Sequence, residues 1–215
     1  MENHFNKKVV KIIVDNVLID PNNPLLSKGN PRSSGTGFFI DNNGTILTCS
    51  HVIENGANIT IEIPGLDKIL KAKILGICPE LDIGLLKVDY KNKEYLKMGN
   101  SKNVKLGMDI YIVGYPGTNT SQNNIKINKG IISGTLADNI MIDSPINSGN
   151  SGGPLIYKNK VIGINIASLI GKQNMNLSVP IHLFKNLYTQ LKNSKNIITY
   201  KNTLPLLYNL SLIHI

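Results

Sequence analysis

The sequence predicts an all-β fold, and two observations carry that prediction. Short runs rich in Ile and Val alternate with turns that contain Asn and Gly, a pattern typical of many short strands rather than of long helices. The 19 glycines and 10 prolines among 215 residues supply the turns that such strands need. With 41% hydrophobic residues, the chain can bury the core of one domain or of two fused half-domains.

The clearest hairpin is predicted in the segment GFFIDNNGTILTCSHVI. Two apolar runs flank residues 41–44, where Asn-Gly favours the positive φ angles of a tight turn. Turn signals then recur at the close spacing typical of sandwiches and barrels. The further predicted strands are 59–63, 69–77, 83–88, 110–113, 125–132, 140–142, 155–157, 161–167 and 176–179.

The segment before the first hairpin is predicted to be an arm and a loop. Residues 9–18 alternate apolar and polar positions only imperfectly, and they run into a stretch rich in Pro, Asn, Gly and Ser. Residues 1–36 are therefore assigned to an N-terminal arm and loop rather than to the main domain.

The main domain is predicted to span residues 37–194, as two β-rich halves joined near 91–105. One helix is expected at its end, over residues 180–193, with Pro180 in the first turn and leucines spaced along one side. Residues 195–215 are left as a tail.

The charge of the chain raises the question of a nucleic-acid partner. The formal net charge is +9, and a basic patch binds phosphates in a salt-dependent way. Arg32 is the only arginine, however, and the lysines are scattered singly rather than gathered in a block. We therefore expect a solvated lysine surface and no specific nucleic-acid partner, with a basic nucleic-acid-binding barrel as the competing interpretation.

The two cysteines, Cys49 and Cys78, are too few to staple a secreted scaffold and lack the spacing of a metal site. We interpret them as free buried thiols and expect no metal and no cofactor. The first sixteen residues fit neither a secretory signal nor a membrane span, because acidic and polar residues interrupt a short apolar pattern. An intracellular protein without a membrane partner is the resulting expectation.

Three residues far apart in the sequence suggest nucleophilic catalysis. Ser151 stands in SPINSGNSGGPLI, where glycines allow a turn whose amides converge on one point. His51 follows the apolar strand GTILT, so its ring can project from the rim of a sheet and act as the base that a serine hydroxyl needs. Asp82 precedes the apolar run of LDIGLLKV, where pairing with His51 would offset the cost of burying its charge.

Each of these signals has a structural explanation when it is taken alone. A Gly, Ser and Asn segment is often an ordinary loop, and an Asp at such a position can cap a turn. Together, however, they stand in the chain order His, Asp, Ser, which is the order of chymotrypsin and not of subtilisin. The predicted catalytic residues are therefore His51, Asp82 and Ser151, with an oxyanion hole assigned to Gly149, Asn150 and Ser151.

The chain resembles the HtrA/Deg branch of the trypsin-like serine peptidases. The resemblance rests on SSGTGFFI, TCSHV, LDIGLLKV, NSGNSGGPL, VIGINIAS, VGYPG, NKGIISG and LSVPIHLFKNL, and it covers most of the chain. It implies a chymotrypsin-like double β-barrel with a C-terminal helix, polypeptide substrates, and a homotrimer made through the N-terminal arm at residues 9–18. The sequence departs from the family at Ser148, where proline is usual, and at Cys49 and Cys78, where polar residues are usual. No PDZ domain is expected.

The substrate pocket is predicted to be apolar. A pocket for Lys or Arg needs an acidic residue at its base, and the position six residues before Ser151 is Pro145. The residues assigned to substrate binding are Pro145, Ile146, Ile164, Asn165, Ile166 and Leu177. They predict small or medium aliphatic residues before the scissile bond, and residues 164–166 are expected to pair with an extended substrate.

The competing function is that of a proteolytically silent member of the same fold, which would hold unfolded chains in its cleft as a chaperone. The complete set of three catalytic side chains argues against it. Whether residues 148–151 form a working oxyanion hole in the resting state is left open by the sequence.

Overall fold

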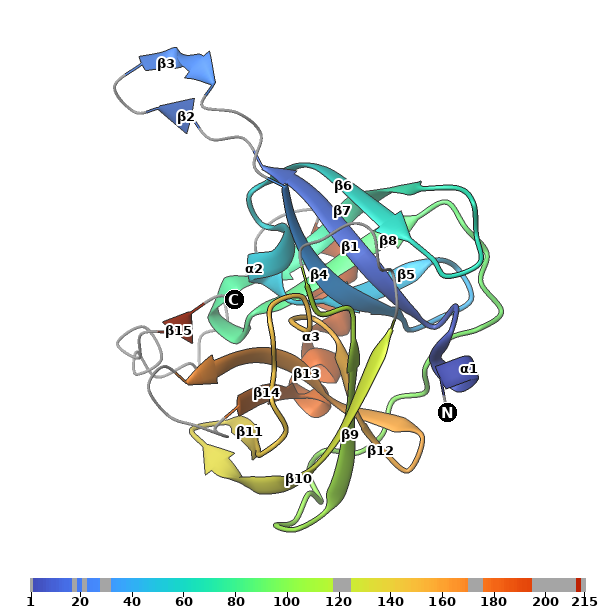
Figure 1. The fold of residues 1–215 in the computed structure, drawn as a ribbon, viewed down its shortest axis with the longest axis vertical. Coiled ribbons are helices and arrows are strands. Elements are labelled where there is room, and N and C mark those ends of the chain that lie inside the picture. The colour runs from blue at the N-terminus through green and yellow to red at the C-terminus, as the bar shows by residue number, and fades with distance from the viewer. Residues whose placement is uncertain are drawn as a thin grey trace.

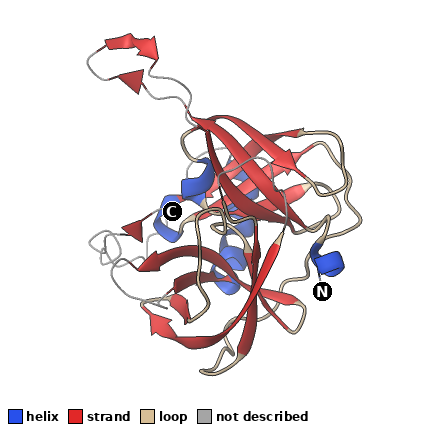
Figure 2. Cartoon of the chain, in the orientation of Figure 1, coloured by secondary structure: helices blue, strands red, loops and turns tan. Residues whose placement is uncertain are grey.

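The fold is built from two β-barrels that pack against each other. The computed structural model describes residues 2–16, 19–20, 23–27, 32–117, 125–169, 176–194 and 212–213. Strands form both halves of the molecule, the earlier part of the chain making one half and the later part the other (Figure 1). Figure 2 shows that helices contribute only short segments beside one longer helix.

The first barrel closes in the strand order β1-β4-β5-β8-β7-β6. Its strands are β1 (Val9–Asn16), β4 (Arg32–Phe39), β5 (Thr45–Thr48), β6 (Gly56–Glu62), β7 (Leu70–Cys78) and β8 (Ile83–Val88). All neighbouring pairs are antiparallel. A short helix α1 (Glu2–Phe5) precedes this barrel, and a separate small hairpin of β2 (Ile19–Asp20) and β3 (Asn23–Ser27) projects from it (Figure 1).

The second barrel has the strand order β12-β9-β10-β11-β14-β13 and closes through pairing of β13 with β12. Its strands are β9 (Asp109–Gly114), β10 (Lys126–Leu136), β11 (Asn139–Ile142), β12 (Pro154–Tyr157), β13 (Lys160–Leu169) and β14 (Asn176–Pro180). A two-residue strand, β15 (Leu212–Ile213), pairs with β13 next to this barrel. The predicted double β-barrel is therefore confirmed.

The N-terminal segment differs from its prediction, because β1 is an integral strand of the first barrel. It pairs with β4 on one edge and with β6 on the other. Every residue from Val9 to Val14 is buried, including Lys11, so the strand shows no clean apolar and polar alternation. This explains why the sequence suggested an arm. With both edges paired, β1 offers no free edge for the predicted contact between copies of the chain.

The predicted hairpin at residues 41–44 is present between β4 and β5. The carboxylate of Asp41 accepts hydrogen bonds from the backbone N–H groups of Asn43, at 2.8 Å, and Thr45, at 3.1 Å. Gly44 has φ +85°, and a Cβ atom there would lie 2.5 Å from the carbonyl oxygens of Val88 and Tyr90. This position therefore requires glycine both for its dihedral angle and for space.

We expect Gly44→Ala to destabilise the first barrel. The left-handed backbone costs an L-residue about 1–2 kcal/mol, and the contact with two carbonyls adds to that, so Tm should fall by more than about 4 °C. Gly65→Ala is the matched control, because Gly65 has φ +74° but nothing within 4 Å of the added Cβ. Thermal unfolding of both variants measures the difference. Equal losses of Tm would contradict a steric role for Gly44.

Helix α3 (Ile181–Ser194) joins the two barrels. It follows β14 of the second barrel and packs against β7 and β8 of the first. Its buried residues recur at helical spacing on one face: Ile181, Leu183, Phe184, Leu187 and Leu191. The helix was predicted one residue too early, because Pro180 ends β14 opposite Gly163 instead of starting the helix.

The two barrels share one continuous apolar core, which includes Phe38 and Leu47 of the first barrel, Ile164 and Leu177 of the second, and Phe184 of α3. The connection between the barrels runs over residues 89–108 and carries one isolated bridge, from Met98 to Val161. Among the residues that the structure describes, no helix has the length and apolarity needed to cross a membrane.

Candidate active site

His51 lies on α2 (Ser50–Ile53), a single helical turn that begins just after strand β5 ends at Thr48. Val52 and Ile53 are buried, so the turn is packed onto the first barrel and its backbone is held in place. The side chain of His51 is 10% exposed. The prediction that a strand ends directly before this histidine therefore agrees with the structure.

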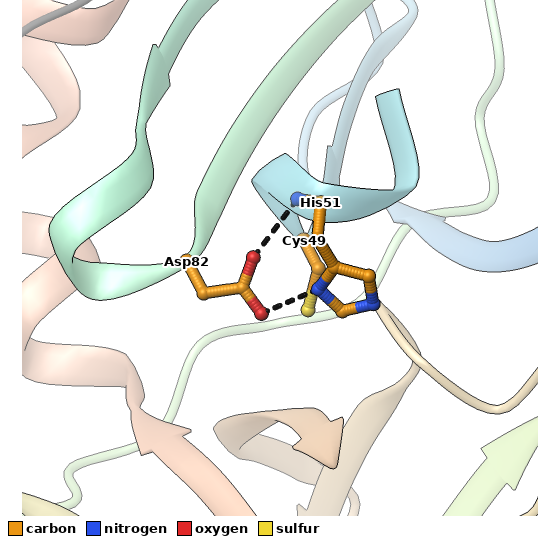
Figure 3. A group of neighbouring side chains, drawn as sticks. All are labelled: Cys49, His51 and Asp82. Carbon is orange, nitrogen blue, oxygen red and sulfur yellow. Dashed lines mark hydrogen bonds and ion pairs between the residues drawn. The ribbon is translucent and has the colours of Figure 1, made fainter. Parts of the chain in front are cut away.

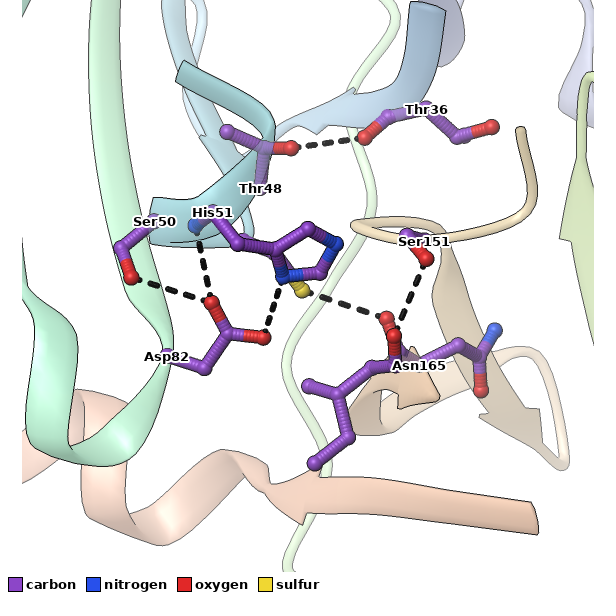
Figure 4. A network of polar contacts seen from close by, with 9 residues as sticks. Thr36, Thr48, Ser50, His51, Asp82, Ser151 and Asn165 are labelled. Atoms are coloured by element: carbon purple, nitrogen blue, oxygen red, sulfur yellow. Dashed lines mark hydrogen bonds and ion pairs between the residues drawn. The ribbon is translucent and has the colours of Figure 1, made fainter. Parts of the chain in front are cut away.

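Asp82 follows the 3₁₀ turn η1 (Pro79–Leu81) and comes just before β8. Its backbone is left-handed, with φ 53° and ψ 46°, a conformation that Asp adopts more readily than most residues. The carboxylate atom Oδ2 lies 2.7 Å from Nδ1 of His51, and Oδ1 accepts a hydrogen bond of 3.0 Å from the backbone N–H of His51 (Figure 3). The hydroxyl of Ser50 also donates to Oδ1, at 3.0 Å (Figure 4). Asp82 thus holds both the ring and the backbone of His51.

This pairing shifts the pKa values of both groups toward their charged forms. Burial alone lowers the pKa of His51, but the charge of Asp82 and its hydrogen bond outweigh burial, and the pKa rises above the ordinary 6.5. Burial likewise raises the pKa of Asp82, but the charge of His51 and the hydrogen bonds from His51 and Ser50 lower it below its ordinary value. Asp82 is therefore ionised near neutral pH.

Ser151 lies in the turn before β12, on the second barrel, and is 1% exposed. In Figure 4 the ring of His51 lies between Asp82 and Ser151. The hydroxyl of Ser151 donates to the carbonyl oxygen of Ile166 at 3.0 Å. Because a hydroxyl has one hydrogen, it does not donate to His51 at the same time. The structure thus brings the three predicted residues to one place, with the serine proton directed to Ile166.

The turn that carries Ser151 depends on glycine. Gly149 has φ +92°, and a Cβ atom there would lie 2.2 Å from the carbonyl oxygen of Tyr115. The carbonyl oxygen of Ser148 accepts from the N–H of Gly117 at 2.8 Å. The N–H of Asn150 donates to the carbonyl oxygen of Asn147 at 2.9 Å, so this amide is already used within the turn. This bond argues against the assignment of Asn150 to the oxyanion hole.

Thr36 is a residue of the site that the sequence did not reveal. It is fully buried on β4 of the first barrel and holds the serine turn of the second. Its hydroxyl donates to the carbonyl oxygen of Gly149 at 2.6 Å and accepts from the N–H of Tyr115 at 2.9 Å. Its own N–H donates to the carbonyl oxygen of Ser151 at 2.8 Å. The only signal in the sequence was a threonine between two glycines at the start of an apolar strand.

Asn165 was assigned to substrate binding, but the structure uses all of its polar groups internally. Its side-chain oxygen accepts from the hydroxyl of Ser178 at 2.8 Å, and its Nδ2 donates to the carbonyl oxygen of Pro154 at 3.2 Å. Its backbone bonds with Gly152 and Gly153, both at distances under 3.0 Å. Asn165 is fully buried and anchors the serine turn to β13. The prediction that it contacts substrate is corrected accordingly.

The apolar residues assigned to the pocket do not form one group. Ile164 and Leu177 are 0% exposed within the core that the two barrels share. Ile166 is 6% exposed in the same core, whereas Ile146 packs in a separate cluster of the second barrel. Pro145 is exposed. Strand alternation explains the burial of Ile164, since a side chain on the inner face of a closed barrel packs into its interior.

Ile166 occupies an irregular position in β13. The pairing register with β14 shifts between Asn165 and Ala167, so Ile166 is a β-bulge residue. A bulged residue leaves the regular ladder, which makes the carbonyl oxygen of Ile166 available to the hydroxyl of Ser151. Of the segment 164–166 that was predicted to pair with substrate, this carbonyl is the group that the structure places at the serine.

One cluster of side chains among the described residues combines the donor atoms that bind metal ions. The ligand atoms of Cys49, His51 and Asp82 all lie within 4.8 Å of one another (Figure 3). The sequence had suggested no metal site, because Cys49 and Cys78 lack the spacing of one.

The double barrel, with a histidine and a carboxylate on one half and a serine on the other, defines the class of trypsin-like serine peptidases. Residues 35–164 match the family described as "Trypsin-like peptidase domain", which is more than half of the chain. The chain belongs to this family, and its relatives place it with the HtrA/Deg type.

Two curated relatives are named as DegP-like periplasmic serine endoproteases. The one from Pseudomonas putida (strain F1) is 34% identical over 174 residues, and the one from Bartonella henselae is 32% identical over 183 residues. These alignments cover 75% and 80% of this chain but only 35% and 36% of the relatives. The chain thus spans about a third of the length of these relatives.

Solved structures show the same fold. A serine endoprotease from Yersinia pestis has a TM-score of 0.72 at 24% identity, covering 89% of this chain and 66% of the other. The HtrA-type protease AlgW with tripeptide has a TM-score of 0.74 at 24% identity, covering 89% and 63%. These likenesses confirm the double-barrel prediction.

The comparisons overturn the expected compartment. The sequence suggested an intracellular protein, but the relatives from both bacteria are named as periplasmic enzymes. The expectation rested on the composition of the first residues and on two unpaired cysteines, neither of which reports directly on where a protein acts.

Proposed function

We propose that this chain hydrolyses peptide bonds of polypeptides, with Ser151 as nucleophile, His51 as general base and Asp82 as the group that orients His51. The observation that supports this best is that the carboxylate of Asp82 makes two hydrogen bonds with His51, one with Nδ1 at 2.7 Å and one with the backbone N–H at 3.0 Å. An ionised carboxylate at Nδ1 keeps the proton there, which leaves Nε2 as the acceptor for the serine proton.

The reaction would proceed through an acyl-enzyme. The hydroxyl of Ser151 leaves the carbonyl of Ile166, gives its proton to Nε2 of His51 and attacks the substrate carbonyl carbon. The N–H groups of Gly149 and Ser151 would stabilise the oxyanion, and His51 then protonates the departing amine. Water, deprotonated by His51, hydrolyses the ester on Ser151 in the second half of the reaction.

Labelling with a fluorophosphonate probe tests this proposal and its dependence on pH. His51 accepts a proton only when neutral, and its pKa lies above 6.5, so the labelling rate should rise with pH and reach half its maximum above pH 6.5. His182→Asn is the control, and its pH profile should match that of the wild type. His182 lies on α3, and burial and the nearby Lys102 hold its pKa below the ordinary value. A rate that is flat between about pH 5 and 8, or unchanged in His51→Ala, would refute the role of His51.

We further propose cleavage after small or medium aliphatic residues. Support comes from Pro145, which stands six residues before Ser151, where a pocket for Lys or Arg would need a carboxylate. A peptide-library digest should therefore show Ala, Val, Ile or Leu before the scissile bond. Cleavage confined to Lys and Arg would reject this preference.

A silent peptide-binding chaperone is the second candidate. The hydrogen bond from Ser151 to the carbonyl of Ile166 favours it, because the resting hydroxyl is not directed at its base. A chain that suppresses aggregation of an unfolded protein but does not react with the probe would support this candidate over the peptidase.

A homotrimer also stays a prediction. Since β1 is part of the first barrel, the described elements of the N-terminal segment outside that barrel are α1 and the β2–β3 hairpin, which projects from the barrel in Figure 1.

A further inference from the structure

Cys49 lies directly against the His51 and Asp82 pair. It occupies the junction between β5 and α2 and is fully buried. Its Sγ atom contacts the carbonyl oxygen of Asn165 at 3.2 Å, across the boundary between the barrels. The Sγ atom, a ring nitrogen of His51 and a carboxylate oxygen of Asp82 lie within 4.8 Å of one another (Figure 3). A thiol, an imidazole and a carboxylate thus meet at one point.

We propose that these three side chains form a binding site for a zinc-like divalent cation, and that the bound cation switches the peptidase off. The ligands would be Sγ of Cys49, Nδ1 of His51 and Oδ2 of Asp82. Sulfur, imidazole nitrogen and carboxylate oxygen are the donors that Zn²⁺ combines in proteins, whereas Mg²⁺ and Ca²⁺ prefer oxygen alone. Three protein ligands leave a fourth position for water.

The geometry needs only small adjustments to hold the ion. Bond lengths of about 2.0–2.3 Å in a tetrahedral site place ligand atoms about 3.3–3.6 Å apart. The 2.7 Å between Nδ1 of His51 and Oδ2 of Asp82 must therefore open by less than about 1 Å, while the more distant thiol moves closer. The side chains of His51 and Asp82 are 10% and 18% exposed, so the ion can enter from their side although Cys49 is covered.

The second carboxylate oxygen is already held in the way that metal sites require. Oδ1 of Asp82 accepts from the hydroxyl of Ser50 and from the N–H of His51, both at 3.0 Å. These bonds fix the carboxylate and leave Oδ2 as the single coordinating atom. A thiolate and a carboxylate together neutralise a divalent cation. The metal-bound site therefore has no net charge, which lowers the cost of burying the ion.

Binding the ion changes the state of His51. The thiol proton of Cys49 passes to solvent, and the proton on Nδ1 moves to Nε2 as the metal takes its place. Nε2 then carries a hydrogen and cannot accept the proton of Ser151. The inhibition therefore rests on the proposed role of His51 as base, whereas the binding of the ion does not.

Cobalt titration of the reduced chain tests the site without reference to activity. Co²⁺ takes the place of Zn²⁺, and a thiolate bound to Co²⁺ gives a charge-transfer absorption in the near ultraviolet. The wild type and Cys78→Ser should show this band, and Cys49→Ser should lose it. Cys78 is the matched control, because it is the other buried free cysteine and contacts Glu80 at 3.6 Å. A wild type without the band, or a Cys49→Ser variant that keeps it, overturns the proposal.

Three further variants separate the site from the peptidase mechanism. Ser50→Ala should weaken Co²⁺ binding by about tenfold or more, since it removes a partner of a ligand and not a ligand itself. Ser151→Ala should keep the band and the affinity, because Ser151 is not a ligand. If Cys49→Ser does not fold, as judged by circular dichroism, His51→Ala replaces it, and an affinity equal to that of the wild type counts against the site.

Inhibition by Zn²⁺ is then measured separately from Co²⁺ binding. Zn²⁺ should block fluorophosphonate labelling of the wild type at the concentration at which it displaces Co²⁺. If the chain binds Co²⁺ through Cys49 but the probe never labels it, the result supports the metal site and refutes the peptidase proposal. A labelled chain that Zn²⁺ does not inhibit while bound refutes the switch.

Discussion

Ser151→Ala is expected to lower kcat for a peptide substrate by about 10⁶-fold, since removal of the serine nucleophile has a cost of that order in peptidases with this mechanism. The alanine methyl group fits where the serine Cβ lies, and the change removes only the hydroxyl that donates to the carbonyl of Ile166. KM should therefore change little, because the groups that bind the peptide stay in place.

Ser144→Ala is the control for this loss. Ser144 is 2% exposed and Ser151 is 1% exposed, and both lie in the second half of the chain. The hydroxyl of Ser144 has no hydrogen-bond partner among the described residues, so its removal should leave kcat unchanged. Steady-state kinetics on a peptide that the library digest shows to be cleaved measures both variants. A Ser151→Ala variant within about tenfold of the wild-type kcat would exclude Ser151 as nucleophile.

Asp82→Asn is expected to lower kcat by about 10⁴-fold. The amide group is nearly isosteric with the carboxylate, but its NH₂ donates to Nδ1 of His51 where the carboxylate accepted. The histidine then keeps its hydrogen on Nε2, which is the wrong tautomer for a base. The backbone N–H of His51 and the hydroxyl of Ser50, which donate to Oδ1 at 3.0 Å, can still donate to the amide oxygen.

The pH dependence of the residual activity gives a second readout of Asp82. The negative charge of Asp82 raises the pKa of His51, so its removal should lower that pKa and move the activity profile toward lower pH. Asp109→Asn serves as the control, because the side chain of Asp109 is 64% exposed and pairs with Lys129 on the surface. A profile in Asp82→Asn that does not move would contradict the electrostatic coupling of the two residues.

The sequence predicted the parts of the site that local chemistry specifies. Asn43-Gly44 was assigned to a turn because few residues tolerate positive φ, and Gly44 has φ +85°. His51 was predicted to follow a strand, and it does so after Thr48. Ser151 was found through the glycines around it, since Gly149 adopts a backbone that other residues avoid.

The predictions failed where pairing with distant strands decides the outcome. Residues 9–18 were assigned to an arm because a strand buried on both faces shows no alternation, and β1 became part of a barrel. Asn165 was assigned to substrate, but the partners of its amide, Ser178 and Pro154, come from two other strands. Thr36 was missed for the same reason, since its hydroxyl bonds to Gly149 on the other barrel.

By itself the sequence determined the all-β class, the order of the histidine, aspartate and serine, and the glycine turn, because each depends on side-chain type and near neighbours. Only the tertiary structure decided that Cys49 lies beside His51 and Asp82, that the proton of Ser151 goes to Ile166, and that Thr36 braces the serine turn. These contacts join segments up to 113 residues apart. Their distances are set by how two closed barrels pack, which no local pattern encodes.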